Sequence, residues 1–360
     1  MQTKYLQPLV AVQFILPLTL CAAPLDALLS ADLPGGPGQL RLELGVDAVN
    51  DTLDFLHLRS SDPAYTGTNV GDYQGQHVLV SYRLTDDWSA SGQLWRRRID
   101  YRTDSAYIDS WQVAGQYRLL GNAASPGHLA VRMSVWGNAS AELVKSSPTT
   151  VAGKTVYDVR VDSAHDLQKQ LDVVGTWRLS DSVSVNALGG FGQSRVGAGG
   201  VTALYKTGSG CTYRLTFAGS ALNGALADTC SASGPVLDTF SAATDADLHV
   251  SYRANYWLVG GSLQWFNQDW MLRGGFFRQQ LKRSEVDDTI RNLGGVAYTA
   301  NNTWVAEISR RIAPHSAVVL RGQLMSNQFV GEIPFAYNPM TASKFGKRYG
   351  MATLAWLGVF

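Results

Sequence analysis

Apolar and polar residues alternate one by one along most of this chain, and this period of two limits the possible folds more than any other feature. In the stretch LRLELGVDA, for example, Leu40, Leu42 and Leu44 alternate with Arg41 and Glu43. Successive side chains of a β-strand point to opposite faces of the sheet, so each alternating run predicts a strand with one apolar and one polar face. The sequence therefore predicts an all-β protein.

Twelve alternating runs follow one another after residue 39, each about as long as a tilted membrane strand, which needs roughly 9 to 11 residues. Their central parts lie at 39–48, 76–85, 88–99, 109–119, 128–138, 167–179, 183–194, 254–266, 270–279, 302–312, 317–326 and 349–360.

The connections between these runs alternate in length. Short ones lie at 85–87, 120–127, 180–182, 267–269 and 313–316, and long ones lie at 49–75, 100–108, 139–166, 195–253, 280–301 and 327–348. An even number of strands with short turns at one end and long loops at the other is the organisation of bacterial outer-membrane barrels, whose short turns lie in the periplasm. A soluble β-sandwich has no reason to follow this rule.

Composition agrees with a single large β domain and excludes a strongly charged partner. The chain has 36 glycines, 15 tyrosines and 10 tryptophans, and its net charge is +1. Because a nucleic-acid-binding surface needs a basic excess, we expect no nucleic acid partner. The histidines and carboxylates show no metal-ligand spacing, so we expect neither a metal nor another cofactor.

The first 31 residues differ from the rest and predict a secretory signal peptide with a short leader. Lys4 gives a positive start, Leu9 to Leu20 form an apolar core, and Cys21, Ala22 and Ala23 follow. We expect cleavage between residues 22 and 31, which leaves 32–360 as the barrel with its long loop 195–253. A lipoprotein site at Cys21 is disfavoured because Leu20 before it is not small.

Two cysteines remain in the exported chain, Cys211 and Cys230. An even number of cysteines in an exported protein favours a disulfide, here within loop 195–253, and free thiols are the alternative. In the same loop, ALYKTG and SGCTYRLTF predict a hairpin, and ALNGALAD predicts a short helix. Whether this loop caps the barrel or folds into it as a constriction is open at this point.

The final strand carries the most specific resemblance. The chain ends YGMATLAWLGVF, with Ala352, Leu354 and Trp356 in phase with the terminal Phe360, although Gly358 departs from the usual apolar residue. It resembles the C-terminal strand by which outer-membrane proteins are read by the barrel assembly machinery, with Phe360 as the assembly signal. The resemblance implies a transmembrane antiparallel up-and-down β-barrel of about 12 strands, with both termini in the periplasm and long extracellular loops, held in outer-membrane lipid.

The repeat YRL at 82–84 and WRL at 177–179 fixes the phase of the strands. If Val78, Val80 and Tyr82 face lipid, Arg83 faces the lumen, and the reverse phase would cost about 2 to 4 kcal/mol for an arginine near the bilayer midplane. The same phase turns a set of arginines inward near the turn end of their strands: Arg41, Arg83, Arg118, Arg132, Arg178, Arg273, Arg311 and Arg321. Arg97 is a further candidate. The inward carboxylates are Glu43, Asp47, Asp172 and Glu307.

Two interpretations of these arginines are open. They can tie the wall together and fill a narrow lumen, or they can line a hydrated constriction that prefers anions. In the second interpretation, the arginine-lined lumen resembles that of the oligogalacturonate-specific and sialic-acid porins. Those proteins generally have shorter strands and loops. This interpretation predicts a porin-like channel for passive diffusion of small polar, preferentially anionic solutes.

Two other classes remain as alternatives. A structural or adhesive barrel would have a closed lumen and loop aromatics such as Tyr65, Tyr73, Phe335 and Tyr337 for partner contacts. A hydrolase needs a spaced His and Ser or a group of His and Asp at the rim; the candidates are His315 and Ser316, together with His57, His165, Asp51, Asp54, Asp287 and Asp288. None of these has the spacing of a catalytic motif, so we do not expect an enzyme. The sequence leaves the state of assembly undetermined.

Overall fold

The structure is a computed structural model that describes most of the chain. The described residues are 26–33, 35–49, 72–101, 104–122, 125–146, 148–151, 154–218, 221–228, 230, 236–243, 250–292, 294–327, 331–338, 342 and 349–360. The core of the expected signal peptide and the loop positions Asp51, Asp54, His57 and Tyr65 lie outside these residues. Among the described residues, no helix is long and apolar enough to span a membrane.

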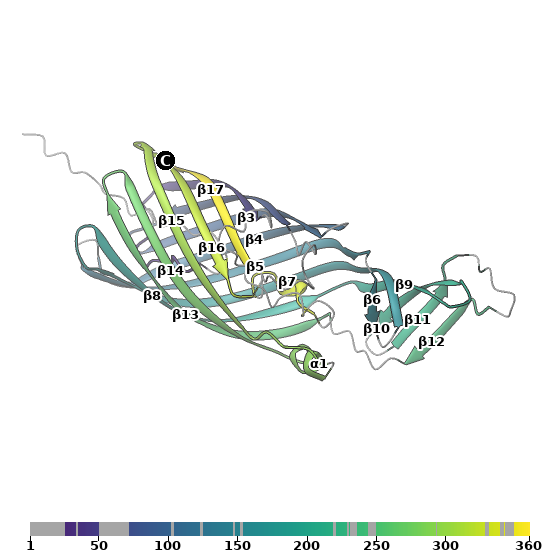
Figure 1. Ribbon diagram of the computed structural model, residues 1–360. Helices are drawn as coiled ribbons and strands as arrows, with labels where there is room; N and C mark the ends of the chain where they lie inside the picture. The colour runs from purple at the N-terminus through teal and green to yellow at the C-terminus, as the bar shows by residue number, and fades with distance from the viewer. Residues whose placement is uncertain are drawn as a thin grey trace, which may run out of the picture.

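Twelve strands close into an antiparallel barrel, which confirms the predicted fold class (Figure 1). They are β1 (Leu40–Val49), β2 (Asp72–Arg83), β3 (Trp88–Tyr101), β4 (Asp104–Leu120), β5 (Gly127–Lys145), β7 (Lys154–Arg178), β8 (Val183–Gly197), β13 (Tyr252–Asn267), β14 (Trp270–Arg283), β15 (Ala300–Ala313), β16 (Ser316–Met325) and β17 (Tyr349–Val359). The barrel closes where β1 pairs with β17, and Leu40 and Phe360 exchange backbone hydrogen bonds at this seam. We call the end with the short turns and Phe360 the turn end, and the other the loop end.

Every predicted run falls on a barrel strand, but several strands continue beyond it. Only residues 102–103 separate β3 from β4, where a loop at 100–108 was predicted. Similarly, β5 and β7 stay paired as far as Lys145 and Val159, where 139–166 was predicted as a loop. The predicted loops were wrong here because both faces of a strand meet water once it leaves the membrane, and the period of two then fades while the pairing persists.

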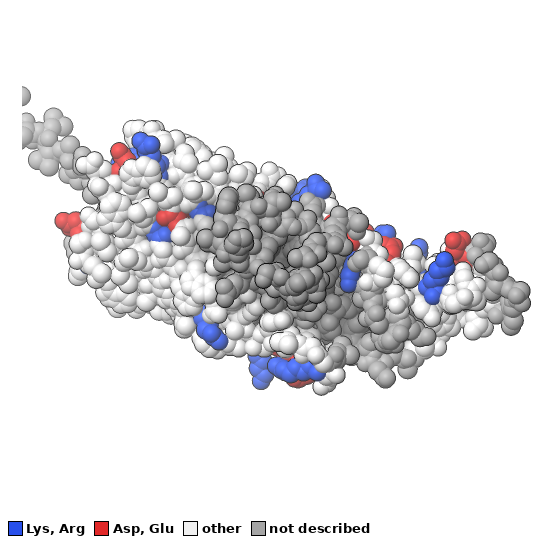
Figure 2. Space-filling view, in the orientation of Figure 1, with Lys and Arg blue, Asp and Glu red and all other residues white. Residues whose placement is uncertain are grey.

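The outer wall of the barrel is apolar and exposed. On β2, Val78, Val80 and Tyr82 are exposed while His77 and Leu79 are buried, which confirms the predicted phase. Aromatic side chains gather on the outer wall at the turn end: Tyr82, Trp88, Tyr117, Trp177, Trp265 and Trp270. Where described residues are visible on this face, most of the surface is uncharged (Figure 2). An apolar band bordered by aromatic rings is the surface that a lipid bilayer requires.

The long loop 195–253 forms a sheet that extends the barrel wall beyond the loop end (Figure 1). Its strands are β9 (Gly200–Lys206), β10 (Thr212–Ala218), β11 (Ala221–Leu226) and β12 (Thr239–Ala243). Strand β9 pairs with the loop-end part of β7, and the short β6 (Thr149–Val151) also pairs with β7 there. The hairpin prediction is confirmed, but the predicted helix is wrong. The segment ALNGAL is β11, because it lies between two strands that satisfy its backbone.

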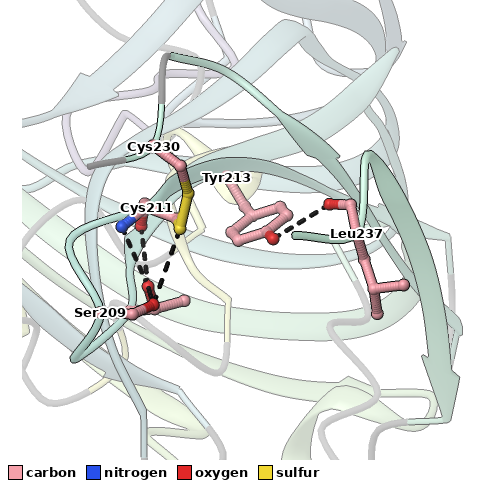
Figure 3. Close-up of a disulfide and its surroundings, with 6 residues drawn as sticks. Ser209, Cys211, Tyr213, Cys230 and Leu237 are labelled. Atoms are coloured by element: carbon pink, nitrogen blue, oxygen red, sulfur yellow. Dashed lines mark hydrogen bonds between the residues drawn. A yellow bond between two sulfur atoms is a disulfide. The ribbon is translucent and has the colours of Figure 1, made fainter. Parts of the chain in front are cut away.

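The disulfide between Cys211 and Cys230 joins the start of β10 to the segment after β11 (Figure 3). Beside it, Tyr213 donates a hydrogen bond to the carbonyl of Leu237 (3.0 Å) and packs edge-on against Phe240. These contacts hold the extending sheet together without using the barrel.

Two segments that are not part of the wall fill the lumen. The N-terminal segment (26–33) lies inside the turn end, with Ala27, Leu28, Leu29 and Ala31 each no more than 2% exposed. The inner loop (331–338), which contains the short η2 (Pro334–Ala336), lies inside the loop end. Helix α1 (Val286–Asn292) covers part of the loop end through the buried Val286 and Ile290.

Candidate functional site in the barrel lumen

The predicted inward arginines fall into three groups. Arg41, Arg132, Arg273 and Arg321 are buried in the lumen, and we call these four the arginine layer. Arg83 and Arg118 lie at the rim of the turn end, against the turn that joins β2 to β3. The side chains of Arg178 and Arg311 lie at strand ends, exposed and half-buried respectively.

The register of the sheet places two arginines on either side of one carboxylate. Arg273 on β14, Glu307 on β15 and Arg321 on β16 lie directly opposite one another on adjacent strands. Arg273 donates to one oxygen of Glu307 through two nitrogens (2.9 and 2.7 Å), and Arg321 donates to the other (2.9 Å). Because Glu307 is fully buried, losing it would leave two buried cations without their shared anion, which costs about 3 to 5 kcal/mol.

This row of charges continues across the barrel seam. Arg321 also lies 3.6 Å from Glu43 on β1, and the His77 ring on β2 contacts Glu43 (3.2 Å) and Asp47 (2.9 Å). Thr353 on β17 donates to Asp47 (2.5 Å). Six strands therefore share one buried polar network, as a wall needs when charged groups are removed from water.

Arg132, in the arginine layer, makes only a long contact with a wall carboxylate. Its guanidinium lies 3.6 Å from Asp172, too far for a good hydrogen bond, and its two terminal nitrogens have no hydrogen-bond partner. It borders a cavity of about 30 Å³ between the wall and the N-terminal segment, with Ser30 and Gln116 also lining it. That volume holds about two water molecules, so no larger solute fits beside the segment there.

The N-terminal segment is held by polar contacts to the wall. Thr176 donates to Asn186 (2.6 Å) and accepts from the backbone N–H of Ala31 (2.8 Å). Since a hydroxyl has one proton, the Ser30 hydroxyl must be the donor in its contact with Thr176 (3.0 Å). Gln116 donates to the carbonyl of Ser30 (2.9 Å). Three hydrogen bonds therefore join Ser30 and Ala31 to the wall.

Charge also ties the segment to its surroundings. Asp32 contacts the His128 ring, and the Asp26 carboxyl interacts electrostatically with Arg273, Arg321 and Arg132. Asp26 thus supplies the arginine layer with a carboxylate that does not belong to the wall. At the rim, Arg83 donates to the carbonyl of Gly35, just after the segment.

The inner loop is held against the wall at the loop end by a second set of contacts. Arg97 donates to Glu332 (2.7 Å), Asn138 donates to the Glu332 carbonyl (3.0 Å), and Tyr252 donates to the Pro334 carbonyl (2.6 Å). The Tyr337 hydroxyl accepts the backbone N–H of Tyr298 (2.9 Å), and burial raises the pKa of this hydroxyl against the opposing effect of the Arg283 guanidinium. Phe335 and Tyr337, considered above as surface contacts, are buried in the lumen.

Sequence reasoning missed the groups that these two segments contribute. Asp26 belongs to the stretch treated as leader, Asp32 is the first residue after it, and Glu332 belongs to a loop without alternation. The available signal was the position of the carboxylates: a cut before Asp26 would leave DALLSADL, an apolar stretch with acids at both ends. The described residues contain no group of three or more His, Cys, Asp or Glu that could hold a metal ion.

The closed barrel, its apolar outer wall and its polar interior define a β-barrel protein of the bacterial outer membrane. No protein-family model matches the chain, and no curated protein matches it in sequence.

Solved structures share the fold. The KdgM porin in complex with disordered oligogalacturonate is 9% identical, with a TM-score of 0.38 over 89% of this chain and 99% of that chain. The translocator domain of the autotransporter NalP from Neisseria meningitidis is 11% identical, with a TM-score of 0.45 over 90% of this chain and 89% of that one. The toluene transporter TbuX of Ralstonia pickettii is 12% identical, with a TM-score of 0.37 over 93% and 92%. These likenesses concern the fold alone, and no function follows from them.

Proposed function

We propose that the protein is a gated outer-membrane channel for small polar solutes, preferentially anions, and that the N-terminal segment is its stopper. The observation that carries this proposal is a lumen with a polar, charged wall occupied by a segment that is not part of that wall. Serine, threonine and glutamine side chains hold the segment by a few hydrogen bonds. A solute path along this wall opens only when the segment leaves.

Charge supports the preference for anions. The four arginines of the layer face three wall carboxylates, Glu43, Asp172 and Glu307, and the fourth carboxylate is Asp26 of the segment. When the segment leaves, it takes Asp26 with it, and cations outnumber carboxylates at this level. A hydrated lumen with surplus arginine favours anions.

Conductance in a planar bilayer tests the proposal. We expect the full mature chain to stay mostly silent, and a variant lacking 26–33 to open in steps. In the open variant, Arg132→Gln should move the reversal potential toward cations. It removes an arginine whose two terminal nitrogens have no hydrogen-bond partner in the wall. Arg178→Gln is the matched control, since this arginine is exposed at the turn end, and it should leave the potential unchanged.

Silence of both the full and the shortened chains would reject the channel. Conductance with no difference between the two would reject the stopper. An unchanged reversal potential in Arg132→Gln would reject the role of the arginine layer in selectivity while leaving the channel intact.

A second candidate is a closed barrel that presents its extending sheet to a partner. The observation that favours it is the disulfide-linked sheet β9–β12, which stands beyond the loop end (Figure 1). Shortened chains that stay silent, together with partner binding lost on deletion of this sheet, would support this candidate over the channel.

A further inference from the structure

Four cationic side chains lie together on the outer wall, near the loop end. Lys169 on β7, Arg195 on β8, Arg253 on β13 and Lys282 on β14 are all exposed and point away from the lumen. We call them the outer cluster. They lie on four adjacent strands, so at roughly 4.8 Å between strands the cluster is about 14 Å wide.

The sheet register brings these charges close together. Arg195 lies directly opposite Arg253 on the neighbouring strand, and Lys282 lies opposite Asn255, two residues along β13 from Arg253. Lys169 lies opposite Gln193, two residues along β8 from Arg195. Gln193 and Asn255 are hydrogen bonded to each other (3.0 Å) in the middle of the cluster.

Among the described residues, the four cations of the cluster are not balanced by an anion of the protein. Within the part of the chain that the structure describes, none of the four side chains forms an ion pair or a hydrogen bond. Like charges directly opposite on adjacent strands are destabilising. By contrast, Arg96 on β3, which also faces outward, lies 3.9 Å from Asp109 and 5.6 Å from the centre of the Tyr107 ring.

The cluster borders the apolar band of the outer wall. An exposed apolar row of Leu171, Phe191 and Trp257 lies nearer the turn end, two residues from Lys169 and four residues from Arg195 and Arg253. A lipid whose acyl chains cover this row places its headgroup at the height of the cations, about 7 Å further along the strands for the two lysines and about 13 Å for the two arginines. Arginine binds phosphate oxygens through paired N–H donors.

We propose that the outer cluster binds the phosphate groups of a lipid in the leaflet at the loop end. The kind of lipid it fits is a phosphorylated glycolipid, because two or more phosphates on one headgroup match four cations spread over about 14 Å. The site lies on the outer wall, so it is independent of whether the lumen opens.

Binding of diphosphoryl lipid A to the full mature chain in detergent tests this proposal, with phosphatidylcholine as the neutral reference. The variant Arg195→Gln/Arg253→Gln should bind lipid A about thirtyfold more weakly, since each cation near an anionic surface contributes about 1 kcal/mol and 1.4 kcal/mol is tenfold. The matched control is Arg96→Gln/Arg278→Gln, which removes the same charge from outward arginines that have protein partners. It should bind like the parent chain.

Each other result overturns the proposal. Equal weakening in both double variants would mean that overall charge attracts the lipid, and no weakening in either would mean that the outer cluster does not contact it. Displacement of lipid A by an excess of inorganic phosphate would mean that the cluster is a site for free phosphate. Retention of the native barrel, seen by its resistance to unfolding in cold detergent, checks that each variant is folded.

Discussion

The arginines inside the barrel and those of the outer cluster differ in how their charge is balanced. Arg273 and Arg321 share the buried carboxylate of Glu307, whereas Arg195 and Arg253 face each other without one. A cation removed from water needs a fixed partner in the protein, while a cation at the membrane interface can be balanced by a headgroup. Arginine therefore stabilises the wall on the lumen side, whereas on the outer side its charge is available to bind a ligand.

The largest expected effect comes from breaking the inner pairing. Glu307→Gln should lower the free energy of unfolding by about 3 to 5 kcal/mol, because it leaves Arg273 and Arg321 buried without their shared anion. Asp109→Asn is the control, since its pair with Arg96 is more than 60% exposed at both ends and should contribute less than about 1 kcal/mol. Urea unfolding followed by tryptophan fluorescence measures both, and equal losses would contradict this contrast.

A smaller effect is expected where the wall holds the N-terminal segment. Thr176→Val removes the acceptor for Ser30 and Ala31, which should cost about 1 to 3 kcal/mol in holding the segment. Hydrogen exchange of residues 26–33 should speed up, while the strands keep their protection. Thr353→Val makes the same change at a buried threonine that bonds to Asp47 and not to the segment. Faster exchange of 26–33 in this control as well would show that the effect is not local.

Removing arginines from the outer wall should raise the free energy of unfolding, the opposite of the effect expected for Glu307→Gln. In detergent without phosphorylated lipid, Arg195→Gln/Arg253→Gln should raise the free energy of unfolding by up to about 1 kcal/mol, because it removes a repulsion between opposite positions on adjacent strands. The same urea titration measures it. A destabilisation as large as that of Glu307→Gln would mean that these arginines have partners in the wall after all.

The smallest effect on the barrel is expected from reduction of Cys211–Cys230. The disulfide closes a loop with a sequence separation of 19 within the extending sheet, where it contributes about 3 kcal/mol. Reduction should make 212–243 more sensitive to protease and leave the unfolding midpoint of the barrel unchanged. A lower midpoint would show that the sheet supports the wall.

Much of the barrel could be predicted from the sequence because the membrane enforces its phase. Val78 and Val80 are outside and His77 is inside as alternation requires, and the predicted inward carboxylates Glu43 and Glu307 are buried. A slip by one residue would have reversed each of these positions.

The contents of the lumen could not be predicted because no periodicity marks them. Asp26 and Glu332 reach the interior through segments whose path depends on tertiary contacts, and a signal-like start hid the first of them. Arg178 shows a related limit. It follows the same local pattern as Arg83, and each arginine is the last residue of its strand, yet the Arg178 side chain is exposed, whereas Arg83 bonds to Gly35 and the next turn. The alternation of apolar and polar residues determines which way a side chain points only inside a strand, not at its last residue.

A reversible tether tests most directly whether the N-terminal segment stops the lumen. The hydroxyls of Ser30 and Thr176 lie 3.0 Å apart, so Ser30→Cys/Thr176→Cys should form a disulfide between segment and wall. We predict complete silence in the planar bilayer while this bond is oxidised and, after reduction, stepwise openings at least as frequent as the rare openings of the unsubstituted chain, which the same reductant should leave unaffected. Conductance that ignores the state of the tether, or silence in both states, would contradict the account.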